Sequence, residues 1–169
     1  ENIVKIRYAG NHFVKKSSKT VNAILMDYID GQTLDELMEK NKEGIHEEEA
    51  INYSKQLFSG LNYLYSKKIF HKDLHLRNIK IDNKGLIKIL DFGIAGNLNE
   101  ESKDNRKYGG ENDLQSLGQI MYKMATGEHL FNPSIDKSTY LIPEEVKLER
   151  ERVYNNPKTL QTRLQQVEE

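Results

Sequence analysis

Residues 71–78 read HKDLHLRN, and residues 91–93 read DFG. These two stretches place Asp73, Asn78 and Asp91 at a spacing that suits the transfer of a phosphoryl group. One carboxylate can orient a hydroxyl group and accept its proton. The amide and the other carboxylate offer the hard oxygen ligands that Mg²⁺ prefers. We therefore predict a reaction site at these three residues.

Two short apolar stretches separate the two motifs. Residues 79–90 carry isoleucine and leucine on either side of a DNKG turn at residues 82–85, and this pattern predicts a β-hairpin. The order of motif, hairpin and motif resembles the H-R-D-L-x-x-x-N and D-F-G signature of protein kinases. The resemblance implies an α+β, protein-kinase-like fold.

The resemblance also implies a division of the chain. Residues 1–131 would form part of a protein kinase-like domain, in which residues 1–29 are a remnant of the small lobe with its last two strands and the hinge. Residues 30–131 would form the helical large lobe, and residues 132–169 a polar, helical C-terminal tail. The Gly-rich loop, the phosphate-pairing Lys and its Glu partner would precede residue 1, so we expect the chain alone to be inactive.

The composition narrows the functional classes. The chain has 169 residues, enough for one domain with a core, and a net charge of −1 indicates neither a nucleic-acid partner nor a membrane surface. The absence of Cys excludes a disulfide framework and a thiolate zinc site. No apolar run approaches the length of a membrane span. We expect a cytoplasmic protein.

Hydrophobic periodicity predicts the remaining elements. Strands are expected at 3–8 and 21–26, helices at 34–40, 47–66 and 113–124, and loops at 10–20 and 97–112. Thr33 is a candidate N-cap of the first helix. The apolar positions of the second and third helices are expected to face the core, and they include Ile51, Phe58, Leu61, Tyr65, Leu114 and Met121.

Within the resemblance, each residue of the two motifs has an implied role. Asp73 matches the catalytic base, and Asn78 and Asp91 match the residues that hold Mg²⁺. His71 matches a structural ring that stacks toward Phe92.

The resemblance implies an ATP site at the hinge between the lobes. The backbone of Asp27 and of Ile29 matches the positions that contact adenine. Met26 matches the residue at the back of the pocket, and Thr33 matches a position near the ribose. Asp113, at the expected start of the third helix, matches an aspartate that braces the catalytic loop.

Several positions depart from the family pattern. Lys72 replaces Arg and lacks the planar fork that binds a phosphorylated loop. His75 replaces a Lys that contacts the γ-phosphate. Lys80 replaces an apolar residue under adenine, and we expect its stem to cover the ring while its ammonium group reaches solvent. The segment between Asp91 and Asp113 is short and lacks Ala-Pro-Glu.

Three functions stay open at this point. The favoured one is an ATP- and Mg²⁺-dependent phosphotransferase that acts on Ser or Thr of a protein substrate. The second is a small-molecule kinase similar to the aminoglycoside phosphotransferases, since these also have Asp-Leu-His and lack Ala-Pro-Glu. The third is a pseudokinase that serves as a binding scaffold, against which the three intact motif residues argue.

Overall fold

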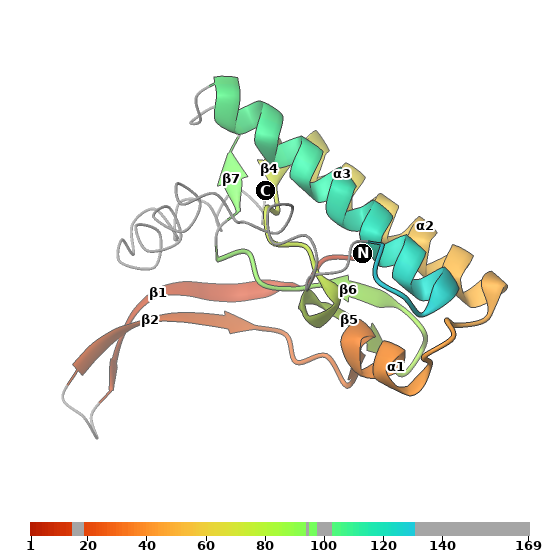
Figure 1. Cartoon of the computed structure of the whole chain (residues 1–169). Helices are drawn as coiled ribbons and strands as arrows, with labels where there is room; N and C mark the ends of the chain where they lie inside the picture. The colour runs from red at the N-terminus through yellow and green to blue at the C-terminus, as the bar shows by residue number, and fades with distance from the viewer. Residues whose placement is uncertain (15–18, 94, 98–102, 131–169) are drawn as a thin grey trace.

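The computed structural model describes residues 1–14, 19–93, 95–97 and 103–130. Helices and small antiparallel sheets follow one another along the chain (Figure 1), and the expected α+β class is confirmed. The elements are β1 (Ile6–Val14), β2 (Lys19–Met26), β3 (Gly31–Thr33), α1 (Leu34–Lys40), α2 (Glu47–Ser66), β4 (Ile69–Phe70), the 3₁₀ turn η1 (Leu76–Asn78), β5 (Ile79–Asp82), β6 (Ile87–Ile89), β7 (Gly96–Asn97) and α3 (Lys103–Thr126).

β1 and β2 form an antiparallel hairpin that is longer than the sequence indicated. Gly10 pairs with Ala23 and Phe13 pairs with Thr20, so parts of the stretch at 10–20 expected as a loop belong to strands. The side chains there are mainly polar, so the sequence lacks the alternation of apolar and polar residues that predicts a strand. Backbone pairing needs only the partner strand, and strand preference depends strongly on context.

The segment before β1 joins the hairpin to the rest of the protein. Val4 donates its backbone N–H to the carbonyl of Ile89 at 3.0 Å, and Ile89 donates to the carbonyl of Asn2 at 2.9 Å. Val4 and Ile6 are buried and Lys5 between them is exposed, as a strand at 3–8 predicts, but Tyr8 is 46% exposed because the register of β1 shifts between Ile6 and Tyr8. The hairpin therefore starts from a strand-like contact with β6.

The hairpin predicted within residues 79–90 is confirmed. β5 pairs with β6 around the turn at 82–85, and β3 adds a third antiparallel strand beside β5. Gly31 is required where β3 meets β5, because a Cβ atom there would lie 1.9 Å from the carbonyl oxygen of Ile81. Its φ of 155° also lies in a region that side chains disfavour.

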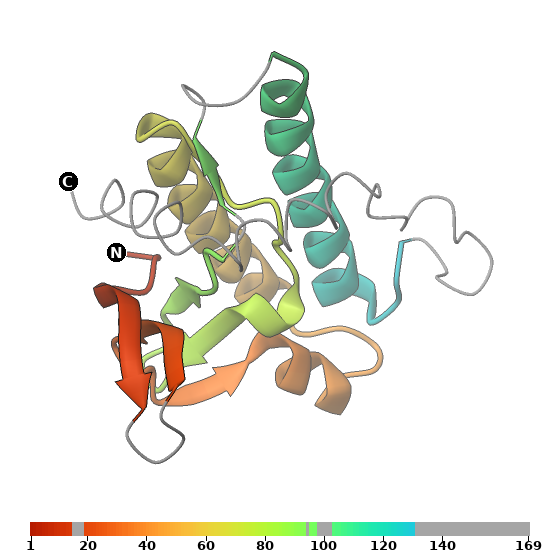
Figure 2. The ribbon, with the colours of Figure 1, turned by 90° about the vertical axis from the view of Figure 1, so that its left-hand side faces the viewer.

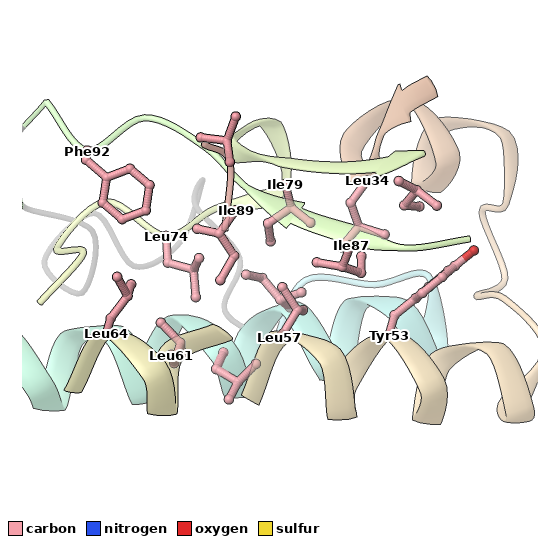
Figure 3. Close-up of a cluster of buried hydrophobic side chains, with 14 of the residues drawn as sticks. Leu34, Tyr53, Leu57, Leu61, Leu64, Leu74, Ile79, Ile87, Ile89 and Phe92 are labelled. Carbon is pink, nitrogen blue, oxygen red and sulfur yellow. The ribbon is translucent and has the colours of Figure 1, made fainter. Parts of the chain in front are cut away.

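Helices α1 and α2 match their predicted bounds. Thr33 caps α1 as expected, since its hydroxyl accepts from the amide of Glu36 at 3.1 Å while the Glu36 carboxylate accepts from the amide of Thr33 at 2.7 Å. The buried face of α2 packs against β6 in one core (Figure 3), with Leu57, Leu61 and Leu64 no more than 1% exposed.

Four apolar positions that were expected in the core lie at the surface instead. Ile51 and Phe58 on α2 are 45% and 59% exposed, and Leu114 and Met121 on α3 are 52% and 42% exposed. A stripe of apolar residues wider than the contact between two elements cannot be buried on all sides, and isolated exposed apolar residues are common.

Helix α3 begins at Lys103, well before the predicted start at Asp113. The expected loop at 97–112 is therefore wrong for residues 103–112 and for Asn97, which lies in β7, and residues 98–102 lie outside the described residues. Polar residues and the Gly109–Gly110 pair lowered the helix signal there, because Gly costs about 1 kcal/mol in a helix interior. The start of α3 at Lys103 was therefore not determined by the local helix propensity of the sequence.

The β5–β6 hairpin lies between the α2–α3 pair and the β1–β2 hairpin in Figure 1, and the chain that follows α2 runs down between the α2 and α3 ribbons in Figure 2. Among the described residues, no helix is both long and apolar enough to cross a bilayer. The tail expected at 132–169 lies outside the described residues, so the predicted boundary at residue 131 stays a prediction.

Candidate functional site

His71 ties the 71–78 segment to the stretch that precedes Asp91. Its ring is fully buried and packs edge-on against Phe92, with 5.1 Å between the ring centres. The amide of Asp73 donates to Nδ1 of His71 at 3.3 Å, so the ring proton belongs on Nε2, which lies 2.8 Å from the carbonyl of Leu90. The structural role predicted for His71 is confirmed.

Asp113 holds the backbone at the start of this segment from α3. Its carboxylate, 1% exposed, accepts from the amide of His71 at 2.8 Å and from the amide of Lys72 at 2.7 Å. Lys72 has a φ of 65°, a left-handed conformation that costs a non-glycine residue about 1–2 kcal/mol. The bond from its amide helps to hold that conformation. The bracing role is confirmed, although Asp113 lies inside α3 and not at its start.

Tyr65 also belongs to this hydrogen-bond network. The sequence predicted Tyr65 only as one of the core-facing apolar residues of α2. Its hydroxyl forms a hydrogen bond with the carboxylate of Asp113, and burial followed by that negative charge raises the pKa of Tyr65. Burial also raises the pKa of Asp113. The electrostatic influence of His71 and Lys72 and the hydrogen bonds from their backbone amides act in the opposite direction and lower it. A tyrosine at a core-facing position of a helix predicts a hydrogen-bond partner, because a buried hydroxyl group needs one. This feature of the sequence could have indicated the role of Tyr65.

Asn78 connects Asp73 with the end of β6. Its side-chain Nδ2 donates to the backbone carbonyl of Asp73 at 2.9 Å, and the backbone carbonyl of Asn78 accepts from the backbone amide of Leu90 at 2.8 Å. Since the amide nitrogen is used as the donor, the amide oxygen is the Asn78 atom suited to a cation. One residue after Leu90 comes Asp91, so the three predicted residues converge on one region.

Asp91 follows β6 and is exposed. Its backbone has a left-handed φ of 59°, and its Oδ1 accepts from the amide of Gly93 at 3.1 Å. No group of three or more His, Cys, Asp or Glu side chains that could hold a metal occurs among the described residues. A cation held by Asn78 and Asp91 would therefore need further oxygen ligands, which is the usual situation for Mg²⁺ bound with phosphates.

His75 lies beside the candidate base. Its Nε2 is 3.9 Å from Oδ2 of Asp73, and its buried Nδ1 has no hydrogen-bond partner within the described residues. Burial lowers the pKa of His75, more than the negative charge of Asp73 raises it. The ring is therefore neutral near pH 7 and can give one hydrogen bond.

At the expected hinge, Met26 is the last residue of β2 and Asp27 follows it. The guanidinium of Arg7 donates two hydrogen bonds to the carboxylate of Asp27, and these lower the pKa of Asp27. The amide of Asp27 donates to the carbonyl of Lys5 at 2.9 Å. Met26 pairs with Ile6 and is 39% exposed.

Lys80 is half-buried, and its ammonium group has partners at the hinge. Its ammonium group donates to the carbonyl of Ile29 at 2.9 Å and lies 5.4 Å from the ring centre of Tyr28. The ammonium thus uses a hinge carbonyl that the resemblance assigns to adenine. The Thr33 hydroxyl oxygen is likewise engaged as a helix cap. The nucleotide roles of these residues stay predictions.

Comparisons with known proteins agree with this arrangement. The protein kinase domain family model matches residues 1–167. The tyrosine-protein kinase JAK1 of Danio rerio is 35% identical over 108 residues, which cover 64% of this chain and 9% of that protein. The serine/threonine-protein kinase PrkC of Bacillus subtilis is 30% identical over 127 residues, covering 64% of this chain and 19% of that protein.

A chain in the crystal structure of the yeast RNA Pol II CTD kinase CTDK-1 complex has a similar fold. The TM-score is 0.62 at 28% identity, and the match covers 78% of this chain and 47% of that chain. The present chain thus spans less than half of that solved chain and less than a fifth of either curated relative.

Proposed function

The chain belongs to the protein kinase family, and from this premise we propose that its protein transfers the γ-phosphate of Mg-ATP to a serine or threonine hydroxyl of a protein substrate. The observation that carries the proposal is the bonded path from Asp73 through Asn78 to Leu90, next to Asp91. It supports a rigid reaction site because both bonds involve backbone groups that cannot rotate away.

In the proposed mechanism Asp73 orients the acceptor hydroxyl and takes its proton. Little proton transfer occurs before the transition state of phosphoryl transfer, so positioning is the main contribution of this carboxylate. The amide of Asp73 is held by His71, and its carbonyl is held by Asn78. Anchored on both sides, the residue keeps its backbone in place while substrates enter and leave.

Asn78 and Asp91 would hold Mg²⁺ through their oxygen atoms. The use of the Asn78 nitrogen as a donor and the exposure of Asp91 both fit this role. When bound, Mg²⁺ neutralises charge on the ATP phosphates. The neutral ring of His75 can donate one hydrogen bond to a phosphate oxygen, in place of the charge of a lysine.

For nucleotide binding we propose the backbone of Asp27 and Ile29, next to Met26 and Thr33. The carbonyl of Ile29 already accepts from Lys80, so an adenine amino group would share or replace that bond. The cytoplasmic location also stays a proposal.

The test compares variants of the full-length protein in a phosphate-transfer assay with Mg-ATP and protein substrates. We expect Asp73→Asn to reduce turnover about 100-fold or more while nucleotide still binds, because the variant loses only the carboxylate that orients the acceptor hydroxyl and takes its proton. Asp91→Ala should abolish turnover and weaken Mg²⁺-dependent nucleotide binding.

Glu48→Gln, an exposed acidic residue at the start of α2, is the matched control and should leave turnover unchanged. Full turnover in both Asp73→Asn and Asp91→Ala would refute the assigned roles. Transfer only to tyrosine, or only to small alcohols, would retain the phosphotransferase and overturn the acceptor proposed here.

A further inference from the structure

A pocket opens at His75, next to the candidate base. It has a volume of about 200 Å³, and the residues that line it include Asp35 of α1, His75 and Arg77 of the 71–78 segment, Lys123 of α3, and His129. Because His75 is 3.9 Å from Asp73, the pocket adjoins the place where an acceptor hydroxyl would sit. A group bound in it would therefore be close to the reacting hydroxyl.

The charged groups that line the pocket favour an anion. Arg77 and Lys123 are cationic and Asp35 is the one carboxylate among the lining residues described. Burial of His75 and partial covering of the otherwise exposed His129 lower the pKa of both rings, which are therefore neutral near pH 7 and can serve as hydrogen-bond donors. The lining thus carries a net positive charge with neutral polar groups around it.

Lys123 is held in position before any ligand arrives. Its ammonium group donates to the carbonyl of Gly127 at 2.8 Å, which uses one of its three hydrogens and leaves the charge in place. Arg77 is exposed on the turn η1 and supplies several donors in a planar fork that suits a carboxylate. A cation that is already held loses less conformational entropy on binding.

The size of the pocket favours a single side chain. Pockets for small molecules commonly have volumes of about 300–1,000 Å³. A volume of about 200 Å³ is smaller than this range. Leu74, Leu76, Ile120 and Leu130 provide apolar wall for the methylene groups of such a side chain.

We propose that this pocket, the Arg77–Lys123 pocket, binds the carboxylate side chain of an Asp or Glu that lies close to the acceptor hydroxyl in the protein substrate. The inference rests on the proposed function for the acceptor, and it adds a preference for acidic substrate sequences. Arg77 and Lys123 act here as specificity residues and have no part in the transfer step.

The experiment measures binding separately from turnover. Fluorescent peptides of one sequence carry Glu, Gln, Lys or phosphoserine at successive positions around the acceptor, and their affinity for the full-length protein is measured by anisotropy. We expect the Glu peptide to bind about three- to fivefold more tightly than the Gln peptide at one position, the range of an exposed ion pair. The kcat/KM values should change through KM.

Charge reversal provides the decisive comparison. In the Arg77→Glu/Lys123→Glu double variant, the preference for Glu should be lost and the Lys peptide should bind more tightly than the Glu peptide. Lys55→Glu, an exposed lysine on α2 away from the pocket, is the matched control and should keep the wild-type preference. Melting curves of all variants verify that they are folded.

Equal affinity for Glu and Gln peptides at every position, or a preference that survives the double reversal, would overturn the proposal. A phosphoserine peptide bound more than about tenfold more tightly than the Glu peptide would overturn the choice of a carboxylate. An acidic preference in binding without any phosphate transfer would support the pocket while refuting the proposed function. Phosphate transfer without a preference for acidic peptides would support the proposed function while refuting the role of the pocket.

Discussion

The carboxylate of Asp113 is the acceptor for two backbone amides of the 71–78 segment and a partner of the Tyr65 hydroxyl. Asp113→Ala leaves the buried amide of His71 and the partly buried amide of Lys72 without an acceptor, and each such loss costs about 1–3 kcal/mol. We therefore expect the free energy of unfolding to fall by about 2–6 kcal/mol. This is a large part of the stability of an ordinary domain, which is about 5–15 kcal/mol.

Two milder variants grade the effect. Asp113→Asn keeps one acceptor oxygen but turns a donor toward the second amide, so we expect a loss of about 1–3 kcal/mol. Tyr65→Phe removes a single hydroxyl and leaves both amide bonds intact, with an expected loss of about 1 kcal/mol. The predicted order of destabilisation is therefore Tyr65→Phe, then Asp113→Asn, then Asp113→Ala.

Urea denaturation followed by circular dichroism measures these differences in the full-length protein. Leu114→Ala is the control, because this neighbour on α3 is 52% exposed and its loss should cost no more than about 0.5 kcal/mol. A loss below about 1 kcal/mol in Asp113→Ala would show that the two amides find other partners, and the argument for Asp113 as the anchor would be wrong.

Two further predictions concern Gly31 and His75. Gly31→Ala should lower the free energy of unfolding by more than about 2 kcal/mol, because its Cβ would overlap the carbonyl of Ile81 at a disfavoured φ. Gly118→Ala, whose Cβ in α3 would meet no atom within 4 Å, should instead raise the free energy of unfolding by up to about 1 kcal/mol. Equal effects of the two substitutions in urea denaturation would contradict the reasoning. The pKa of His75 is lower in the folded protein than its ordinary 6.5 because of burial, so the unfolded chain binds more protons below that pH, and stability should decline as the pH falls from about 7 to 5. His75→Gln should flatten this pH dependence, and an unchanged slope would show that His75 does not cause it.

Local patterns in the sequence were sufficient for much of the molecule. The hairpin at 79–90 follows from its turn residues, and the start of α1 follows from the Thr33–Glu36 capping box, because both depend on groups within a few residues of each other. The motif residues Asp73, Asn78 and Asp91 were named from their spacing and from the resemblance of the two motifs to the family signature, and the bonds around Asn78 bring their segments together.

Other features depend on partners that are distant in the sequence. The local sequence predicts loops where α3 begins and where β1 continues, because Gly pairs and polar residues are typical of loops. The structure has a helix from Lys103 and a strand as far as Val14 instead. The exposure of Phe58 and Leu114 reflects which face of each helix meets another element. Periodicity gives the direction of a stripe on a helix but not how much of that stripe a neighbour will cover.

The sequence by itself determined the family pattern, the candidate reaction residues and the helices and strands with strong local signals. The tertiary structure alone decided two contacts, Tyr65 with Asp113 and Lys80 with the carbonyl of Ile29, and it placed Arg77 and Lys123 around one pocket. Each of these arrangements brings together residues that are distant in the sequence. The physical reason is that a charged or polar side chain takes its partner from whatever the packed core brings within reach, and that packing is a property of the whole chain.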